Sequence, residues 1–128
     1  MWIRRAAVVV VFLLFGHPAW AGKILVTPLI QGDTGDTINC GVSNAGKRDL
    51  HVKIELLNGG GTVLLNTDDL AIGAGTANRI QTQLDSSGTN HFVFCRFTVL
   101  SGSAGGVRAS LCLLPVGSAR CAVSADAR

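Results

Sequence analysis

The residues best suited to chemistry in this 128-residue chain lie in one short acidic segment. Asp33-Thr34-Gly35 is the tripeptide in which aspartic proteases hold a catalytic carboxylate, and that reaction needs two aspartates that share one proton. In those enzymes the aspartate directly follows a hydrophobic strand, whereas Gly32 precedes Asp33 here and Asp36 follows the tripeptide. Because aspartate and glycine are residues that turns favour, the sequence predicts a polar turn at this segment rather than a protease site.

The remaining candidates for catalysis or metal binding are one further aspartate and two histidines. Asp49 could join the acidic turn in binding calcium, but the aspartates lack the spacing of a dedicated calcium loop. His51 and His91 each begin a predicted strand. A catalytic histidine needs a nucleophile and an orienting partner, and no serine stands in a Gly-x-Ser-x-Gly turn. We expect solvated histidines, and no catalytic, cofactor or metal site.

The elements that must position these residues are short strands. Segments that alternate in polarity or are rich in β-branched residues recur along the chain, and Gly, Asn and Asp separate them. With no long helical period, this pattern predicts an all-β, antiparallel sandwich. Pro28 marks an edge or a break in the first strand, and 70–75 reads as a corner. The expected strands are 23–31, 36–43, 51–57, 62–66, 76–84, 91–100 and 107–114.

Residues 1–21 have the pattern of a cleavable signal peptide. A basic pair at 4–5 precedes an unbroken apolar run at 6–15, and Ala19-Trp20-Ala21 then puts small residues at −3 and −1 of the cleavage point. As a helix the apolar run spans about 15 Å, half of a roughly 30 Å hydrocarbon core. We therefore expect cleavage before Gly22, a secreted or periplasmic product, and no membrane insertion after cleavage.

Removal of the leader changes what the composition implies. The formal net charge falls from +3 to +1, because both arginines of the leader are lost and all eight acidic residues remain. A net charge of +1 gives too weak a positive electrostatic potential to attract nucleic acid, and we expect no nucleic-acid partner. Trp2 and Trp20 also leave, and the chain has no Tyr. The mature protein thus lacks the aromatic side chains on which carbohydrate-binding modules usually stack sugars.

Four cysteines in an exported chain predict two disulfides and permit three pairings. Cys40 and Cys95 both lie on the apolar faces of their predicted strands, so a bond between them would cross the core. Cys112 lies on the polar face of its strand, and Cys121 follows nine residues later, beyond a turn. The strand faces on which these cysteines lie therefore favour the pairings Cys40–Cys95 and Cys112–Cys121. The domains expected are the leader at 1–21, a sandwich at 22–114, and a tail at 115–128 that the second disulfide ties back.

Three segments together resemble bacterial exported immunoglobulin-like or fibronectin-III-like domains: 40–46 (CGVSNAG), 51–57 (HVKIELL) and 70–75 (LAIGAG). Such domains often show a strand ending in Asn-x-Gly, an alternating strand and a leucine–x–x–Gly corner. The resemblance covers roughly residues 36–114. It implies an immunoglobulin-like sandwich of about seven strands and a role in adhesion or interaction, with no particular ligand. The chain departs from true immunoglobulin domains in lacking the core Trp, and in having Val93 where a Tyr precedes the second core cysteine.

One group of residues is a candidate contact surface. If the last two strands pair, Arg96 and Arg108 face outward on neighbouring strands, and Phe92 and Phe94 share their face. The four side chains would form a small mixed patch of the kind that protein interfaces use. The alternative is that the arginine stems simply pack over the outward phenylalanines.

The function that the sequence favours is a non-catalytic protein-interaction or structural module with an unidentified protein partner. Export, a sandwich with exposed edges and the absence of a catalytic set of residues support it, since sheet edges can add a partner's strand. Two alternatives are open. One is a small secreted inhibitor that presents the 112–121 disulfide loop in extended form, and the other is a carbohydrate-binding module.

Overall fold

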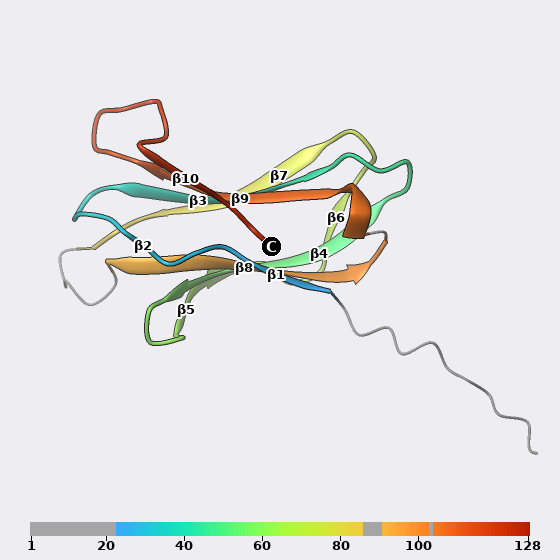
Figure 1. Cartoon of the computed structure of the whole chain (residues 1–128), viewed down its shortest axis with the longest axis horizontal. Helices are drawn as coiled ribbons and strands as arrows, with labels where there is room; N and C mark the ends of the chain where they lie inside the picture. Colours follow the sequence, from blue (N-terminus) through green and yellow to red (C-terminus); the bar gives the residue numbers. More distant parts are fainter. Residues whose placement is uncertain (1–22, 86–90, 103) are drawn as a thin grey trace, which may run out of the picture.

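A computed structural model describes residues 23–85, 91–102 and 104–128, so the predicted signal peptide lies outside the described residues. The described part contains no helix of the length and apolarity needed to cross a membrane. Its elements follow one another along the chain as shown in Figure 1. They are β1 (Ile24–Val26), β2 (Ile30–Gln31), β3 (Thr37–Asn44), β4 (Leu50–Asn58), β5 (Val63–Asn66), β6 (Leu70–Ile72), β7 (Ala77–Gln83), β8 (Phe92–Ser101), the 3₁₀ turn η1 (Ala104–Gly106), β9 (Val107–Leu114) and β10 (Val123–Asp126).

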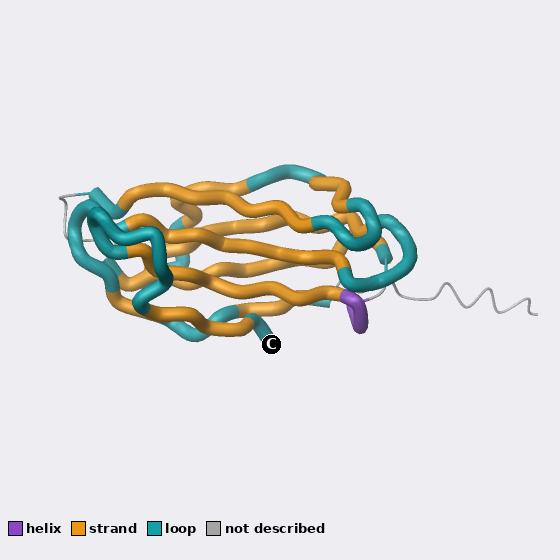
Figure 2. Tube along the Cα trace, turned by 90° about the horizontal axis from the view of Figure 1, so that it is seen from above, coloured by secondary structure: helices purple, strands orange, loops and turns teal. Residues whose placement is uncertain are grey.

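The strands form two antiparallel sheets that pack face to face (Figures 1 and 2). In the first sheet β8 and β4 are central, β1 and β2 both pair with β8, and β5 and β6 both pair with β4. The second sheet has the order β10-β9-β3-β7. The predicted all-β antiparallel sandwich is therefore confirmed at the level of its layers.

The strand β8 illustrates why these sequences form a sandwich. Successive side chains of a strand point to opposite faces, and an alternating sequence therefore buries one face only. On β8 the buried side chains are at most 4% exposed, and they are Val93, Cys95, Phe97 and Val99. The inward faces expected on β3, β4 and β9 are buried in the same way.

The disulfide between Cys40 and Cys95 joins the two sheets through the core. Both cysteines are fully buried, and their Cα atoms are 5.8 Å apart. The bond connects β3 of the second sheet to β8 of the first, and Phe97 and Leu111 belong to the same core cluster. Closing a loop of 55 residues is worth about 4 kcal/mol in the chain-entropy account. The predicted pairing is confirmed, and so is the pairing of Cys112 with Cys121.

The path from β8 to β9 crosses from one sheet to the other. The chain leaves the first sheet after Ser101, passes through η1, and enters the second sheet, where β9 pairs with β3 from Val107 to Leu114. In immunoglobulin domains the strand that carries the second core cysteine and the strand after it lie in one sheet, whereas here β8 and β9 lie in different sheets. The alternating sequence of β9 does not distinguish the two sheets, because the inner face of a sandwich is apolar on both sides.

The segment after β9 does more than close the second disulfide. The Ser118 amide donates a hydrogen bond to the Pro115 carbonyl at 3.0 Å, which closes a turn. Gly117 within this turn has φ of +76°. The chain then returns as β10, which pairs with β9. The sequence analysis did not anticipate β10, nor the short strand β6 inside the predicted corner. It anticipated a break at Pro28, which separates β1 from β2.

Candidate functional site

The residues predicted to form a contact patch lie on two different sheets. Phe92, Phe94 and Arg96 are on the outward face of β8 in the first sheet, and Phe92 is 49% exposed. Arg108 is on the outward face of β9 in the second sheet, where it donates to the carbonyls of its own turn, Gly105 among them. The outer faces of the two sheets point in opposite directions. The four-residue patch is therefore wrong, because its premise that β8 pairs with β9 is not met.

Arg96 is held by Glu55 of the neighbouring strand β4. The Arg96 guanidinium donates to Oε2 of Glu55 at 2.5 Å, and Lys53 Nζ lies 3.5 Å from Oε1. Burial of the Glu55 carboxyl opposes its ionisation, but the hydrogen bond and charge of Arg96, helped by Lys53, outweigh burial and lower its pKa. Glu55 lies on the outward face as predicted, yet it is only 4% exposed because these neighbours cover it.

The acidic segment before β3 forms the predicted turn. The amide of Asp36 donates to the carbonyl of Asp33 at 3.0 Å, and the Asp36 carboxylate accepts from the amide of Asp33 at 2.8 Å. Gly35 has φ of +87°, a conformation that favours glycine. Asp36 is 7% exposed, so its carboxylate serves to hold the turn. The Thr34 hydroxyl lies 3.2 Å from Nε2 of His91.

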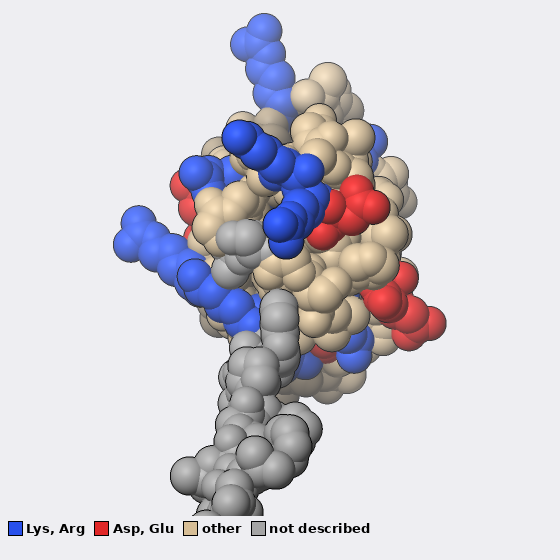
Figure 3. All heavy atoms as spheres, turned by 90° about the vertical axis from the view of Figure 1, so that its right-hand side faces the viewer, with Lys and Arg blue, Asp and Glu red and all other residues tan. Residues whose placement is uncertain are grey.

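The three aspartates considered as calcium ligands are not brought together. Asp49 follows β3 and the acidic turn precedes it, and a strand of eight residues spans about 26 Å. Lys47, Arg48 and Asp49 lie together in the connection between β3 and β4. On the end of the sandwich that faces the viewer in Figure 3, basic and acidic side chains are intermixed. His51 Nδ1 is 2.8 Å from Oδ1 of Asp69 at the surface. The described residues contain no cluster of three or more His, Cys, Asp or Glu suited to a metal.

One side of the sandwich is closed by backbone hydrogen bonds between its sheets. Val26 of β1 and Arg128, two residues after β10, bond to each other in both directions, with N–O distances of 3.0 and 3.2 Å. The Ala127 amide also donates to the Ala109 carbonyl of β9 at 2.9 Å. Since β1 and β10 are edge strands of the two sheets, these bonds protect both edges on this side.

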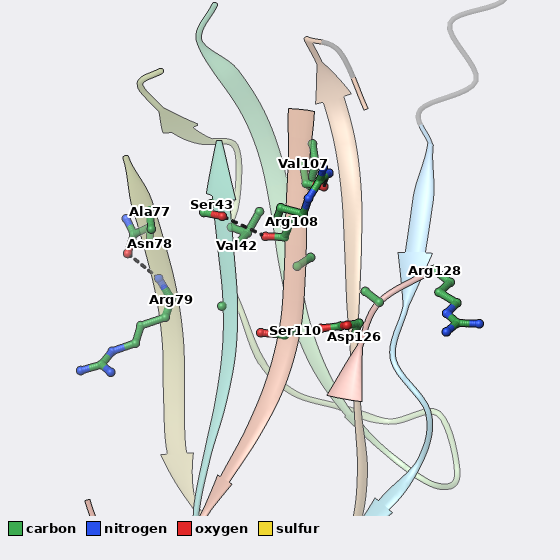
Figure 4. A pocket seen from close by; sticks show the side chains of 13 residues that line it. Val42, Ser43, Ala77, Asn78, Arg79, Val107, Arg108, Ser110, Asp126 and Arg128 are labelled. Atoms are coloured by element: carbon green, nitrogen blue, oxygen red, sulfur yellow. Dashed lines mark hydrogen bonds between the residues drawn. The ribbon is translucent and has the colours of Figure 1, made fainter. Parts of the chain in front are cut away.

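The opposite side is open along β7. This strand is the outermost of the second sheet, and within the described ranges no strand pairs with its far side (Figure 4). Its seven residues pair with β3 without a break in register. The other unprotected edge is made of β5 and β6, which have four and three residues. Among the described strands, β7 therefore forms the longest continuous edge.

The backbone of β7 presents alternate residues to solvent. Its ends are fixed by bonds from Asn44 N to Thr76 O and from Leu84 N to Asp36 O, both 2.9 Å. In an antiparallel ladder the even-numbered residues between them then direct N–H and C=O to β3, and the odd-numbered residues direct theirs outward. The outward residues are all exposed, and they are Ala77, Arg79, Gln81 and Gln83.

Few protective features occur on this edge. Natural edge strands are commonly guarded by charges, proline or bulges. In β7 the only charge is Arg79, and there is no proline and no bulge. One outward amide, that of Arg79, is covered by Oδ1 of the neighbouring Asn78 at 2.8 Å. The strand is thus available to pair with another extended segment.

A shallow groove of about 790 Å³ lies beside β7 on the outer face of the second sheet (Figure 4). Gly41, in the middle of β3, faces Arg79 of β7 on one side and Ser110 of β9 on the other, and Asp126 of β10 faces Ser110. A Cβ at Gly41 would meet no heavy atom within 4 Å. Packing therefore does not require glycine at this position, and the missing side chain deepens the groove.

The sequence analysis identified 76–84 as a strand but did not single it out as a site. The available signal was its composition, because Ile80 is the one large apolar residue in 77–83 and the others, apart from Ala77, are polar. A strand buried on one face shows several apolar residues at alternate positions, as β8 does. A strand with one apolar residue is typical of an edge.

No protein-family model, curated protein or solved structure matches the chain.

Proposed function

We propose that this protein is an exported, non-catalytic protein-interaction module that binds an extended protein segment along β7. The observation that carries the proposal is the difference between the two sides of the sandwich. Backbone bonds at Val26 and Arg128 close one side, whereas β7 leaves four residues with outward backbone groups. Addition of a strand to such an edge is a recurrent mode of peptide recognition.

Hydrogen bonds alone would give such a complex little stability. Each backbone hydrogen bond contributes about 0.5–1.5 kcal/mol net, and association costs about 4 kcal/mol or more in lost freedom of motion. Side chains of the partner must therefore contribute. Arg79 on the outer face and Ile80 on the inner face are the charged and apolar contacts that β7 offers.

Two disulfides are consistent with an oxidising compartment, which supports the proposal of a secreted or periplasmic product. The immunoglobulin-like relationship is also a proposal. The two-sheet sandwich and its core disulfide between Cys40 and Cys95 support it, and the pairing of β9 with β3 counts against it.

The inhibitor alternative loses its main support. The loop between Cys112 and Cys121 is folded on itself, because Ser118 bonds to Pro115 and its hydroxyl bonds to both backbone groups of Arg120 at 3.2 Å. Protease inhibition needs an extended segment, and this loop is a turn instead. No observation favours the carbohydrate alternative over strand addition.

The test is photocrosslinking in the cell of origin. A photoreactive amino acid replaces the outward Gln81 in one variant and the exposed Ser118 in a control variant. The proposal expects a discrete protein adduct through Gln81 and none through Ser118. Capture through Ser118 alone would move the binding surface to the disulfide loop, and no capture through Gln81 would contradict the proposal.

A further inference from the structure

The outward amide of Arg79 already has an acceptor within β7. Oδ1 of the preceding Asn78 lies 2.8 Å from the Arg79 nitrogen, and Figure 4 draws this bond on the strand. In an antiparallel ladder, the carbonyl oxygen of a facing residue occupies that place. The side chain of Asn78 therefore substitutes for a partner's carbonyl, and an added strand must displace it to pair with Arg79.

The side chain of Arg79 is a charge that the described residues leave unpaired. It is exposed, and none of the ion pairs in the described part includes it. Asp126 of β10 lines the neighbouring groove, but β9 and β3 lie between β10 and β7. Three strand spacings amount to about 14 Å, which exceeds the Debye length of about 8 Å at physiological salt. Asp126 therefore does little to neutralise Arg79.

Figure 4 shows where this charge is directed. The Arg79 side chain extends away from β3 and past the open edge of β7. An added strand lies about 4.8 Å from β7 on that same side. The guanidinium is therefore placed beside the residues of an added strand, where a carboxylate can accept two parallel hydrogen bonds from it.

The next position of β7 has the opposite character. Ile80 lies on the inner face, where it packs against the hydrophobic core, and it is the one large apolar side chain of the strand. In an antiparallel partner, the residue that faces Ile80 comes directly before the residue that faces Arg79. Apolar pairs and pairs of opposite charge both stabilise facing strands. The edge therefore fits an apolar residue followed by an acidic one.

We propose that the extended segment bound along β7 runs antiparallel to it and carries an acidic side chain that pairs with Arg79, next to an apolar residue that faces Ile80. This inference rests on the proposed use of β7 as a binding edge and names the chemistry of the partner. The acidic residue exchanges both backbone hydrogen bonds with Arg79, so its carbonyl replaces Oδ1 of Asn78. A lysine or arginine at the same place is repelled, which makes the edge selective.

Three synthetic peptides test the charge. Each has seven residues, as β7 has, and alternates between valine and polar side chains, with glutamate, glutamine or lysine at its centre. Methylation of alternate backbone nitrogens leaves one edge free to pair and prevents the peptides from stacking on themselves. Fluorescence anisotropy measures their dissociation constants for the mature, disulfide-bonded protein. Relative to the glutamate peptide, we expect the glutamine peptide to bind about threefold and the lysine peptide about tenfold more weakly.

Three variants separate the charge of Arg79 from its backbone. Arg79→Glu should reverse the order, so that the lysine peptide binds most tightly. Arg120→Glu, the same change of charge in the exposed disulfide loop, should leave the order of the wild type. Asn78→Ala removes the internal acceptor, and we expect all three peptides to bind about threefold more tightly. In the wild type, amide hydrogen exchange at Arg79 and Gln81 should slow when the glutamate peptide binds.

The outcomes distinguish this inference from the proposed function. If the three peptides bind equally, if the glutamate peptide does not bind at millimolar concentration, or if Arg79→Glu leaves the order unchanged, the acidic partner is wrong. In each of these cases the binding edge stands when Gln81 captures a protein in the cell, and it is wrong when Gln81 captures nothing. An Asn78→Ala variant that binds no more tightly than the wild type would overturn the pairing of a partner's carbonyl with the Arg79 amide.

Discussion

The carboxylate of Glu55 and the guanidinium of Arg96 face each other across β4 and β8, and Glu55 is almost completely buried beneath this contact. The sequence gives no warning of the burial, since a glutamate on the outward face of a strand is ordinarily solvated. What buries it is the pairing of two central strands, which places Arg96 on one flank and Asn66 of β5 on the other.

This ion pair makes stability depend on pH. The pKa of Glu55 is lower in the folded protein than its ordinary value of 4.5. Its contribution is therefore present above that value and is lost as pH falls through the folded pKa. We expect Glu55→Gln to lower the free energy of unfolding by about 1 kcal/mol at pH 7. Urea unfolding from pH 7 down to pH 3 should show the difference between wild type and variant shrink.

The control for this experiment is Asp69→Asn, which removes a carboxylate paired with His51 at the surface. Exposed pairs contribute little, so Asp69→Asn should be close to wild type at pH 7. A constant difference between wild type and Glu55→Gln over the whole pH range would show that burial, rather than ionisation, accounts for the effect.

The backbone bonds between Val26 and Arg128 predict that proline in β1 lowers stability more at one position than at another. The amides of Ile24 and Val26 both point away from β8, since Lys23 and Thr27 make the bonds to that strand. Only the Val26 amide has a backbone acceptor, on Arg128. We expect Val26→Pro to cost about 1 kcal/mol more than Ile24→Pro, the value of one hydrogen bond. Urea unfolding measures the difference, and equal effects would argue against a closed side.

The two disulfides should differ in their contributions. Cys40–Cys95 closes 55 residues and Cys112–Cys121 closes nine. The chain-entropy account gives about 4 kcal/mol for the first and about 2.5 for the second. Replacing both cysteines of a pair by alanine and measuring urea unfolding tests this order. The core pair also leaves a cavity, which enlarges its effect. A larger loss from the 112–121 pair would contradict the prediction.

The sequence predicted the buried faces of β3, β4, β8 and β9 well, and the sheet to which each strand belongs less well. Alternation in β8 and β9 identifies the buried side chains, because burial depends only on which face a residue occupies. It could not show that Arg96 and Arg108 lie on opposite faces of the molecule, since either sheet offers the same apolar interior. The disulfide pairing could be predicted from the sequence because two of the four cysteines lie on the apolar faces of their strands. The β7 edge was not identified, because an edge is defined by what fails to pair with it.

Two glycines should respond oppositely to alanine. Gly41 lies in a strand interior where a Cβ meets nothing within 4 Å, so Gly41→Ala should stabilise the protein by about 0.5 kcal/mol by reducing the freedom of the unfolded chain. At Gly106 a Cβ would lie 2.7 Å from the backbone nitrogen of Gly46. Gly106→Ala must therefore displace the connection between β3 and β4, at a cost of about 1–3 kcal/mol.

Thermal and urea unfolding of both variants measures these changes. If Gly41→Ala is more stable than the wild type, the glycine lowers stability without a packing reason. Glycine inside a strand often marks the close approach of a ligand or another backbone. The groove above Gly41 would then be the place to look for such a contact. Photocrosslinking through Gln81 in the Gly41→Ala background then shows whether the groove takes part in partner binding. A destabilised Gly41→Ala protein would instead mean that β3 needs the glycine for its own conformation.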